Sequence, residues 1–150
     1  MNISIQSPTP DTLQTWLALR KKLWHLCPEE KHLREIQEYL HSNKKQAFIA
    51  YSDDNIPVGF IEVSLRDYAE GCTQSPVAYI EGWFVDEAFR RKGIGTLLMQ
   101  TAEGWAHDHG CTQLASDAEL DNATSIDAHK RMGFKTYNKL VHFIKDIPKE

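Results

Sequence analysis

The chain has 150 residues, a length that suits one compact domain over residues 1–150, and its hydrophobic share of 41% supports a packed core. Its formal net charge of −4 argues against a nucleic-acid partner, because such proteins normally present a basic face. No signal peptide or apolar run of membrane-spanning length is visible, and three scattered cysteines are typical of free thiols, so we expect a cytoplasmic protein without membrane contact.

Hydrophobic periodicity predicts one strand, two helices and a β-hairpin in the first half. The hydroxyl of Thr9, the proline after it and Asp11 provide a helix start. Apolar side chains then recur every three or four residues as far as Trp24, so this helix hides one face. We predict a strand at 2–6, helices at 9–24 and 28–43, and paired strands at 47–51 and 58–65.

The second half predicts further strands that alternate with helices. A stretch rich in β-forming residues precedes a strongly amphipathic helix that ends at Gly110. The predicted elements are a central strand at 77–85, a helix at 94–110, a strand at 111–117, a helix at 122–132 and a last strand at 139–144. Because strands and helices are interspersed, we predict a mixed α/β sheet with helices on both faces.

The segment Arg90-Arg91-Lys92-Gly93-Ile94-Gly95-Thr96 connects the central strand with the amphipathic helix. Glycines let the backbone turn so that several N–H groups converge, and the helix start adds partial positive charge. We therefore expect a socket for a pyrophosphate, with three basic side chains at its rim.

Two other phosphate-binding loops do not fit this segment. A P-loop needs its lysine after the second glycine, whereas Lys92 precedes both glycines. A dinucleotide fingerprint needs a third glycine near Leu98, and the sequence has none there. The remaining alternative is a basic loop that only turns the chain.

The pattern Arg-x-x-Gly-x-Gly between such a strand and helix resembles the GCN5-related N-acetyltransferases, and Gly133-Phe134 is a second mark of that family. A closer resemblance, over nearly the whole chain, is to the aminoglycoside 6'-N-acetyltransferases of the short chromosomal type. It is carried by Trp24, Asn122 and four segments: Ser64-Leu65-Arg66-Asp67-Tyr68, Ser75-Pro76-Val77, Ile80-Glu81-Gly82-Trp83-Phe84-Val85 and Ala115-Ser116-Asp117.

The resemblance implies a mixed central sheet of about six or seven strands flanked by four helices, with the fourth and fifth strands splayed. It also implies acetyl-CoA as cosubstrate, without a metal, and an acyl arm that lies between the splayed strands. The Val85 N–H is then the natural donor to the thioester carbonyl. The implied cofactor-binding residues are Trp83, Phe84, Val85, Arg90, Arg91, Lys92, Gly93, Ile94, Gly95, Thr96 and Asn122.

Glu81 and Asp117 are the implied ligands of the acceptor amine. Glu81 lies four residues before Val85, so the period of two predicts that their side chains share one face of the strand. We expect Asp117 to hydrogen-bond the reacting amine and Glu81 to relay its proton through water, because an ordinary carboxylate is a weak base. The alternative is that Glu81 serves only a strand-end hydrogen bond.

Four further residues have roles that the resemblance implies. Trp24 and Tyr68 would wall the sugar rings with flat apolar faces, although Trp24 also suits the core. His129 takes the position of a tyrosine that protonates the leaving thiolate in many family members, with simple packing as its alternative. Asn138 would line the substrate cleft in a stretch where relatives often carry an acid, so the acidic wall is weaker here.

The sequence thus predicts direct acetyl transfer to the 6'-amino group of an aminoglycoside, and hence antibiotic resistance, by a homodimer whose last strand is an available sheet edge. His107 and His109 do not predict a metal site, because positions i and i+2 of a helix face different directions. Two alternatives stay open. One is the same fold acting on another amine, such as a polyamine, a small metabolite or a protein N-terminus. The other is a non-catalytic sensor that binds acyl-CoA.

Overall fold

The computed structural model describes residues 2–149, which form two compact units. The first unit ends at Asp117 and the second begins at Ala118. The single domain predicted over residues 1–150 stays a prediction. Within residues 2–149, no helix combines the length and the apolar character that crossing a membrane requires.

A mixed sheet forms the centre of the first unit, with the strands in the order β1-β2-β3-β4-β5. Antiparallel pairing joins β1 to β2, β2 to β3 and β3 to β4, whereas β5 runs parallel to β4. The strands are β1 (Ser4–Gln6), β2 (Lys45–Tyr51), β3 (Pro57–Arg66), β4 (Val77–Val85) and β5 (Leu114–Ala115). The predicted α/β class is confirmed, with five strands in residues 2–149 instead of six or seven.

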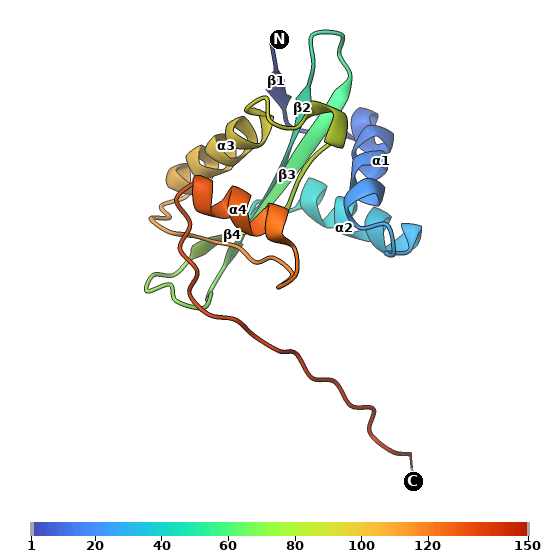
Figure 1. Cartoon of the computed structure of the whole chain (residues 1–150). Helices are drawn as coiled ribbons and strands as arrows, with labels where there is room; N and C mark the ends of the chain where they lie inside the picture. Colours follow the sequence, from blue (N-terminus) through green and yellow to red (C-terminus); the bar gives the residue numbers. More distant parts are fainter. Residues whose placement is uncertain (1, 150) are drawn as a thin grey trace. The chain divides into compact units, whose positions relative to one another are not determined.

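Helices cover both faces of this sheet (Figure 1). A 3-10 turn (Pro10–Thr12) leads into α1 (Leu13–Leu23), and α1 packs with α2 (Glu29–His41) against β3 and β2. On the other face, α3 (Ile94–Asp108) packs against β2, β3 and β4. We call the two faces of the sheet the α1–α2 face and the α3 face, after the helices that cover them.

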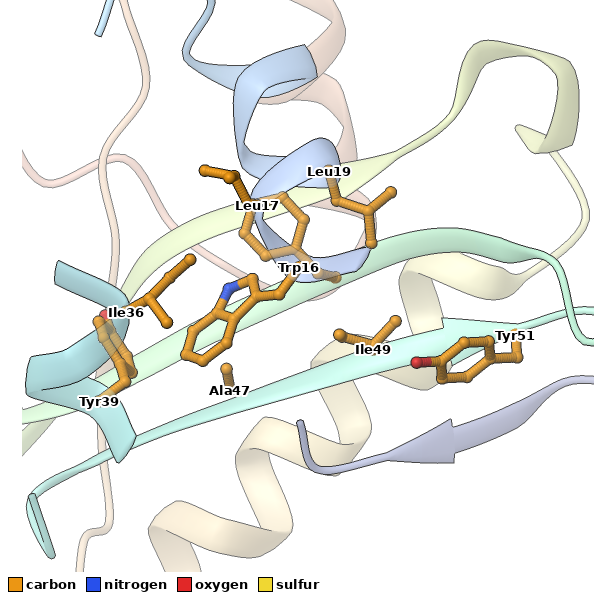
Figure 2. Packing of buried hydrophobic residues seen from close by; sticks show 9 residues of the cluster. Trp16, Leu17, Leu19, Ile36, Tyr39, Ala47, Ile49 and Tyr51 are labelled. Carbon is orange, nitrogen blue, oxygen red and sulfur yellow. The ribbon is translucent and has the colours of Figure 1, made fainter. Parts of the chain in front are cut away.

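Apolar side chains fill the layer between the sheet and the helices α1 and α2 (Figure 2). Trp16 is fully buried there and meets Tyr39 edge to face, with ring centroids 5.8 Å apart. The cluster consists of Trp16, Leu17, Leu19, Ile36, Tyr39, Ala47, Ile49, Tyr51 and Phe60. On the α3 face the buried residues Ile94, Leu98 and Ala102 recur every four positions, as the amphipathic pattern predicts.

Two strand predictions near the C-terminus need correction. The strand predicted at 111–117 is limited to Leu114–Ala115, because β5 pairs with only two residues of β4. The strand predicted at 139–144 is wrong, since residues 134–149 have no regular secondary structure. A strand requires a neighbour that completes its backbone hydrogen bonds, and a segment rich in apolar residues does not by itself supply one. Phe143 and Ile144 are accordingly 92% and 95% exposed.

The second unit is built on α4 (Ala123–Arg131), within one residue of the prediction at each end. Asn122 is its N-cap, and the side-chain oxygen of Asn122 accepts a hydrogen bond from the Ser125 amide at 3.0 Å. Gly133 follows the helix with a φ of +93°, a conformation that glycine adopts without strain.

Candidate active site

β4 is paired with a second neighbouring strand, β5, over only part of its length. β5 pairs with β4 only at Ala78 and Tyr79, so within residues 2–149 the stretch from Ile80 to Val85 has a strand partner on the β3 side alone. This confirms the predicted splaying of the fourth and fifth strands. A strand edge without a neighbouring strand can hydrogen-bond an extended ligand as an added strand would.

The Val85 amide points to this open edge. The next amide, that of Asp86, donates to the Val58 carbonyl of β3 at 2.8 Å. Successive amides of a strand point to opposite edges, so the Val85 N–H points away from β3. The Val85 carbonyl shares that direction and accepts a hydrogen bond from Arg90 Nε at 2.9 Å. A fixed donor in this place can stabilise negative charge on a ligand's carbonyl oxygen.

The two aromatic residues before Val85 point to opposite faces of the sheet. The Phe84 ring packs beside the α1–α2 cluster, 6.1 Å from the ring of Phe60. Trp83 points to the α3 face, where its Nε1 donates to the Gly95 carbonyl at 3.0 Å. Both side chains therefore fix β4 to its surroundings, and contact of either with a cofactor stays a prediction.

The loop before α3 presents its backbone N–H groups at a helix end. After a 3-10 turn (Glu87–Phe89), Arg91 and Gly93 have positive φ angles of 64° and 81°. α3 begins without a side-chain cap, and the Leu97 amide is the first to bond to a carbonyl one turn back, that of Gly93. The preceding amides have no partner inside the helix, and the helix end attracts anions.

Cationic side chains surround this helix end. Arg90, Arg91, Lys92 and Thr96 are exposed, whereas the side chain of Ile94 is 1% exposed and belongs to the core. Ile94 can therefore contribute only its backbone to a ligand. Uncapped amides with a cationic rim suit a diphosphate, and the open edge of β4 suits an extended arm with amide groups. The residues present thus fit acetyl-CoA.

β4 carries one extra residue, Glu81, relative to β3. Gly82 pairs with Glu62 and Ile80 pairs with the next residue of β3, so Glu81 has no opposite residue. This is a β-bulge, and it reverses the alternation of side chains on either side of it. The prediction that Glu81 and Val85 share a face is therefore wrong.

Contacts agree with this reversal. Val85 points to the α3 face, where its Cγ2 lies 3.6 Å from the position of a Cβ built on Gly95. Glu81 instead contacts Ser64 and Arg66, which share a face of β3 with Glu62 and hence with α1. The acid and the Val85 side chain lie on opposite sides of the sheet.

Glu81 is held by two side chains of β3. Arg66 donates from Nε to Oε2 at 2.9 Å and from Nη2 to Oε1 at 2.7 Å, which is a two-pronged ion pair. The Ser64 hydroxyl donates to Oε2 as well. The side chains of Arg66 and Glu81 are 43% and 26% exposed, so the pair is open to solvent.

Tyr79 links this ion pair to Asp117. The Arg66 Cζ atom lies 3.5 Å from the centre of the Tyr79 ring, and the Tyr79 hydroxyl donates to Asp117 Oδ2. The hydrogen bond to Glu81 raises the pKa of Arg66, which stays charged. Burial and the bond to Asp117 raise the pKa of Tyr79, which keeps its proton. The two predicted carboxylates thus belong to one network, which we call the Arg66 network: Ser64, Arg66, Tyr79, Glu81 and Asp117.

Trp24 lies at the end of α1 with its ring over Gly82. A Cβ built on Gly82 would stand 2.5 Å from the ring atom Cη2, so glycine is required there. The ring packs edge-on against Phe60 at 6.0 Å, and the Arg20 guanidinium lies 4.7 Å from its centre. Trp24 is half-buried, so it packs on the core while lying beside the bulge at Glu81.

A buried network of charged and polar side chains holds Trp24 in place. Arg20 Nη1 donates to both Glu62 oxygens at 2.8 and 2.7 Å, and Trp16 Nε1 donates to Glu62 Oε2 at 2.8 Å. Arg20 Nε donates to His32 Nδ1 at 3.1 Å, and His32 Nε2 lies 3.3 Å from the Trp24 carbonyl oxygen. Arg20, Glu62 and His32 are each at most 2% exposed. These contacts fix the end of α1.

Four predicted site residues lie in loops or in the second unit. Tyr68 is 66% exposed in the loop after β3. In the second unit, Asn122 caps α4, and His129 donates from Nδ1 to the Ser125 carbonyl at 2.7 Å. Asn138 is exposed in the stretch without regular secondary structure. Their roles at the site stay predictions.

No function was predicted for Ser64, Arg66 or Tyr79 from the sequence. A signal was present, because polar side chains recur with a period of two on both strands: Ser64 and Arg66 on β3, and Tyr79 and Glu81 on β4. Buried central strands normally carry apolar residues at such positions. Only the register, in which Ser64 faces Tyr79, shows that these residues meet.

Comparison with known proteins relates this geometry to a family. The profile of the acetyltransferase (GNAT) family matches residues 13–134. The aminoglycoside N(6')-acetyltransferase type 1 of Acinetobacter genomosp. 13 is 39% identical over 146 residues, which is 97% of this chain and 99% of that protein. The enzyme of the same name from Klebsiella aerogenes is 41% identical over 136 residues, 89% of this chain and 90% of its own length.

Solved structures are similar over the same length. The structure of AAC(6')-Iy in complex with the bisubstrate analog CoA-S-monomethyl-acetylneamine has a TM-score of 0.92 at 32% identity, covering 98% of this chain and 100% of the other. The apo 6'-N-acetyltransferase AAC(6')-IG from Acinetobacter haemolyticus has a TM-score of 0.89 at 40% identity, covering 99% and 100%. The likeness therefore holds for sequence and backbone alike.

Proposed function

Because the chain belongs to the acetyltransferase (GNAT) family, we propose that it transfers acetyl directly from acetyl-CoA to the 6'-amino group of aminoglycosides and so confers resistance to them. One observation carries the proposal. The open edge of β4 runs from the Tyr79–Asp117 contact to Val85, just before the cationic loop at the start of α3. The full-length similarity to enzymes named for this acceptor supports the choice of substrate.

The first unit holds acetyl-CoA, which supplies an activated acetyl group. The free amides at the start of α3 bind its diphosphate, and Arg90, Arg91 and Lys92 add charge at the rim. The edge of β4 at Val85 bonds to the extended arm as a neighbouring strand would. The Val85 N–H donates to the thioester carbonyl oxygen, where negative charge grows during attack.

The acceptor arrives as an ammonium group and must lose a proton before it can attack. Asp117 binds this amine at the open edge. Glu81 takes the proton through a water molecule, because its oxygens already accept three hydrogen bonds from Ser64 and Arg66. Holding both reactants together contributes on the order of 7–11 kcal/mol to lowering the barrier.

Other residues complete the site in this proposal. Trp24 and Tyr68 offer flat faces to the sugar rings, and Asn138 offers a polar side chain. From the second unit, Asn122 contacts the cofactor and His129 supplies a proton to the leaving thiolate. These roles rest on the motifs that the chain shares with the family.

A panel of amines tests the activity. The protein is incubated with acetyl-CoA and either an aminoglycoside with a 6'-amino group, its analogue with a 6'-hydroxyl group, or spermidine, and thiol release is followed. We expect turnover only with the 6'-amino compound and a product acetylated at that nitrogen. Turnover on spermidine alone would overturn the substrate. Tight binding of acetyl-CoA without turnover on any amine would overturn the enzymatic role.

Matched variants test the acceptor site. We expect Asp117→Asn to raise the KM for the aminoglycoside at least tenfold while leaving the KM for acetyl-CoA within twofold, because the loss of a charge-assisted hydrogen bond is worth about 1.5–3 kcal/mol. Asp108→Asn, the same change at a residue 80% exposed near the end of α3, serves as the control and should match the unchanged protein. Equal effects of the two substitutions would remove Asp117 from the proposed site.

We also infer a homodimer that pairs through residues 139–144. Four of its six residues are apolar, and the side chains of all four are exposed, with 92% for Phe143 and 95% for Ile144. Pairing with a second copy would complete its backbone hydrogen bonds. Sedimentation should give a dimer, and Phe143→Ser with Ile144→Ser should give a monomer. A monomeric unchanged protein would refute the inference.

The three cysteines support a cytoplasmic location. Cys27, Cys72 and Cys111 are free thiols, the state that a reducing compartment maintains. Fractionation of cells should recover the protein with the cytoplasmic contents, and recovery in another fraction would contradict this proposal.

A further inference from the structure

The proposed reaction leaves one charged member of the Arg66 network without a task. Arg66 places a permanent cation on Glu81, in a site that must receive a polycationic amine. An ion pair this exposed contributes little to folding, so stability alone does not account for it. Arg66 contacts both Glu81 and the Tyr79 ring, which bonds to Asp117, and this central position indicates a function in the reaction.

Building on the proposed function, we propose that Arg66 is the positioning residue of the site, which orients Glu81 and Asp117 together and directs the amine to Asp117. The proposal stands on three observations. They are the two-pronged bond to Glu81, the stacking on Tyr79, and the hydrogen bond from Tyr79 to Asp117.

The first arm fixes Glu81. A guanidinium that donates from two nitrogens to both oxygens of a carboxylate holds it in one plane. With the Ser64 hydroxyl also bonded to Oε2, three of about four acceptor positions of the carboxylate are filled. The fourth is on Oε1, so a relay water has one defined place to bind.

The second arm fixes Asp117 through Tyr79. The guanidinium Cζ lies over the phenol ring, 3.5 Å from its centre, which restricts rotation of the ring and hence the position of its hydroxyl. That hydroxyl donates to Oδ2 of Asp117. The raised pKa values of Arg66 and Tyr79 keep both groups protonated under assay conditions, so both arms persist.

The charge of Arg66 also sets which carboxylate attracts the substrate. Paired with Arg66, Glu81 adds no net charge, whereas the partner of Asp117 in this network is the neutral Tyr79 hydroxyl. A cationic amine is therefore drawn more strongly to Asp117 than to Glu81. Glu81 is left to handle the proton.

Arg66→Gln tests the first arm, with Arg34→Gln on the exposed surface of α2 as the matched control. We expect the kcat of Arg66→Gln to fall about tenfold, equivalent to about 1.4 kcal/mol. Its KM for aminoglycosides should fall by up to about fivefold, most for the most highly charged compounds, because Glu81 is no longer neutralised. Arg66→Lys, which keeps the charge without the fork, should restore KM but only part of kcat.

The outcomes separate positioning from structure. A purely structural role would lower the melting temperature and reduce kcat for every acceptor alike, with no change in KM that follows substrate charge. That result, or a kcat within twofold of the unchanged protein, would overturn the proposal. If the unchanged protein acetylates no aminoglycoside, the proposed function fails instead.

Tyr79→Phe tests the second arm, because it keeps the ring under Arg66 but removes the hydroxyl that bonds to Asp117. We expect a KM for the aminoglycoside that rises about fivefold, with kcat changed less than in Arg66→Gln. If both variants change kcat and KM in the same ratio, the two arms do not act as the proposal states.

Discussion

Acidification from pH 7.5 to 5.5 will destabilise this protein through one buried side chain, His32. Its Nε2 faces the Trp24 carbonyl at 3.3 Å, and a carbonyl only accepts, so Nε2 carries the proton. Its Nδ1 is then the acceptor for Arg20 Nε at 3.1 Å. Protonation of Nδ1 would set two N–H groups and two positive charges against each other in a place that is 0% exposed.

The size of the effect follows from linkage. Burial, and then the charge of Arg20, lower the pKa of His32 below its ordinary value of 6.5. Below pH 6.5 the unfolded chain therefore binds a proton that the folded chain does not. The free energy of unfolding is full above that pH and decreases below it, by about 1.4 kcal/mol per pH unit at most. By pH 5.5 the loss approaches about 1.4 kcal/mol, or roughly 3–6 °C in Tm.

Urea unfolding at pH 7.5, 6.5 and 5.5 measures this loss in the unchanged protein and in His32→Gln. Glutamine can accept from Arg20 and donate to the Trp24 carbonyl but does not titrate, so its curve should be flatter by about 1.4 kcal/mol over this range. His25→Gln, the same change at an exposed site, should keep the original slope. An equal dependence on pH in His32→Gln and in the unchanged protein would show that His32 is not the titrating group.

Three further predictions concern packing and charge. Gly59→Ala would put a methyl group 2.5 Å from a carbonyl oxygen of β4 and should lower the free energy of unfolding, measured with urea, by about 2 kcal/mol or more. Gly104→Ala, in open space on α3, should instead raise it by about 0.5–1 kcal/mol. Glu62→Gln leaves a buried guanidinium partly unpaired and should lower the free energy of unfolding by about 3–5 kcal/mol. The control Glu38→Gln, in an exposed ion pair, should lower it by less than about 1 kcal/mol, and equal losses would contradict the buried network. Gly82→Ala displaces the Trp24 indole and should lower kcat/KM for aminoglycosides at least fivefold while the KM for acetyl-CoA stays constant. Unchanged steady-state kinetics would show that the Trp24 ring is not part of the substrate site.

The helices and the hairpin could be predicted because their signals are local. An amphipathic helix shows its buried face in its own sequence, as α3 does through Ile94, Leu98 and Ala102. Caps are local as well, so Asn122 and Gly133 bound α4 within one residue of the prediction. The hairpin of β2 and β3 needed only two β-rich runs around a turn.

Strand pairing could not be predicted in the same way. Residues 111–117 and 139–144 have strand-like composition, yet the first forms two strand residues and the second none. A strand depends on a neighbouring edge, which is a property of the assembled sheet and not of the segment. The splaying that shortens β5 was expected only from family resemblance, because nothing in the local pattern encodes it.

The phosphate loop could be predicted from the residues themselves, since glycines, basic side chains and a helix start are adjacent in sequence. The carboxylates Glu81 and Asp117 were selected by resemblance. Their connection through Arg66 and Tyr79 joins two strands and the end of a third, at sequence separations of up to 38 residues. Such a network becomes visible only when the register is known.

The bulge in β4 explains how one strand can serve both halves of the proposed reaction. In a regular strand Glu81 would point to the α3 face together with Trp83 and Val85, away from Arg66. The inserted residue turns its side chain to the α1–α2 face, where Arg66 and the Trp24 ring lie. Val85 loses nothing by this, because its contribution is an amide that lies in the plane of the sheet and points to the open edge. The direction of that amide does not depend on which face the side chain occupies, so the carbonyl donor and the acid can be placed independently on the same strand.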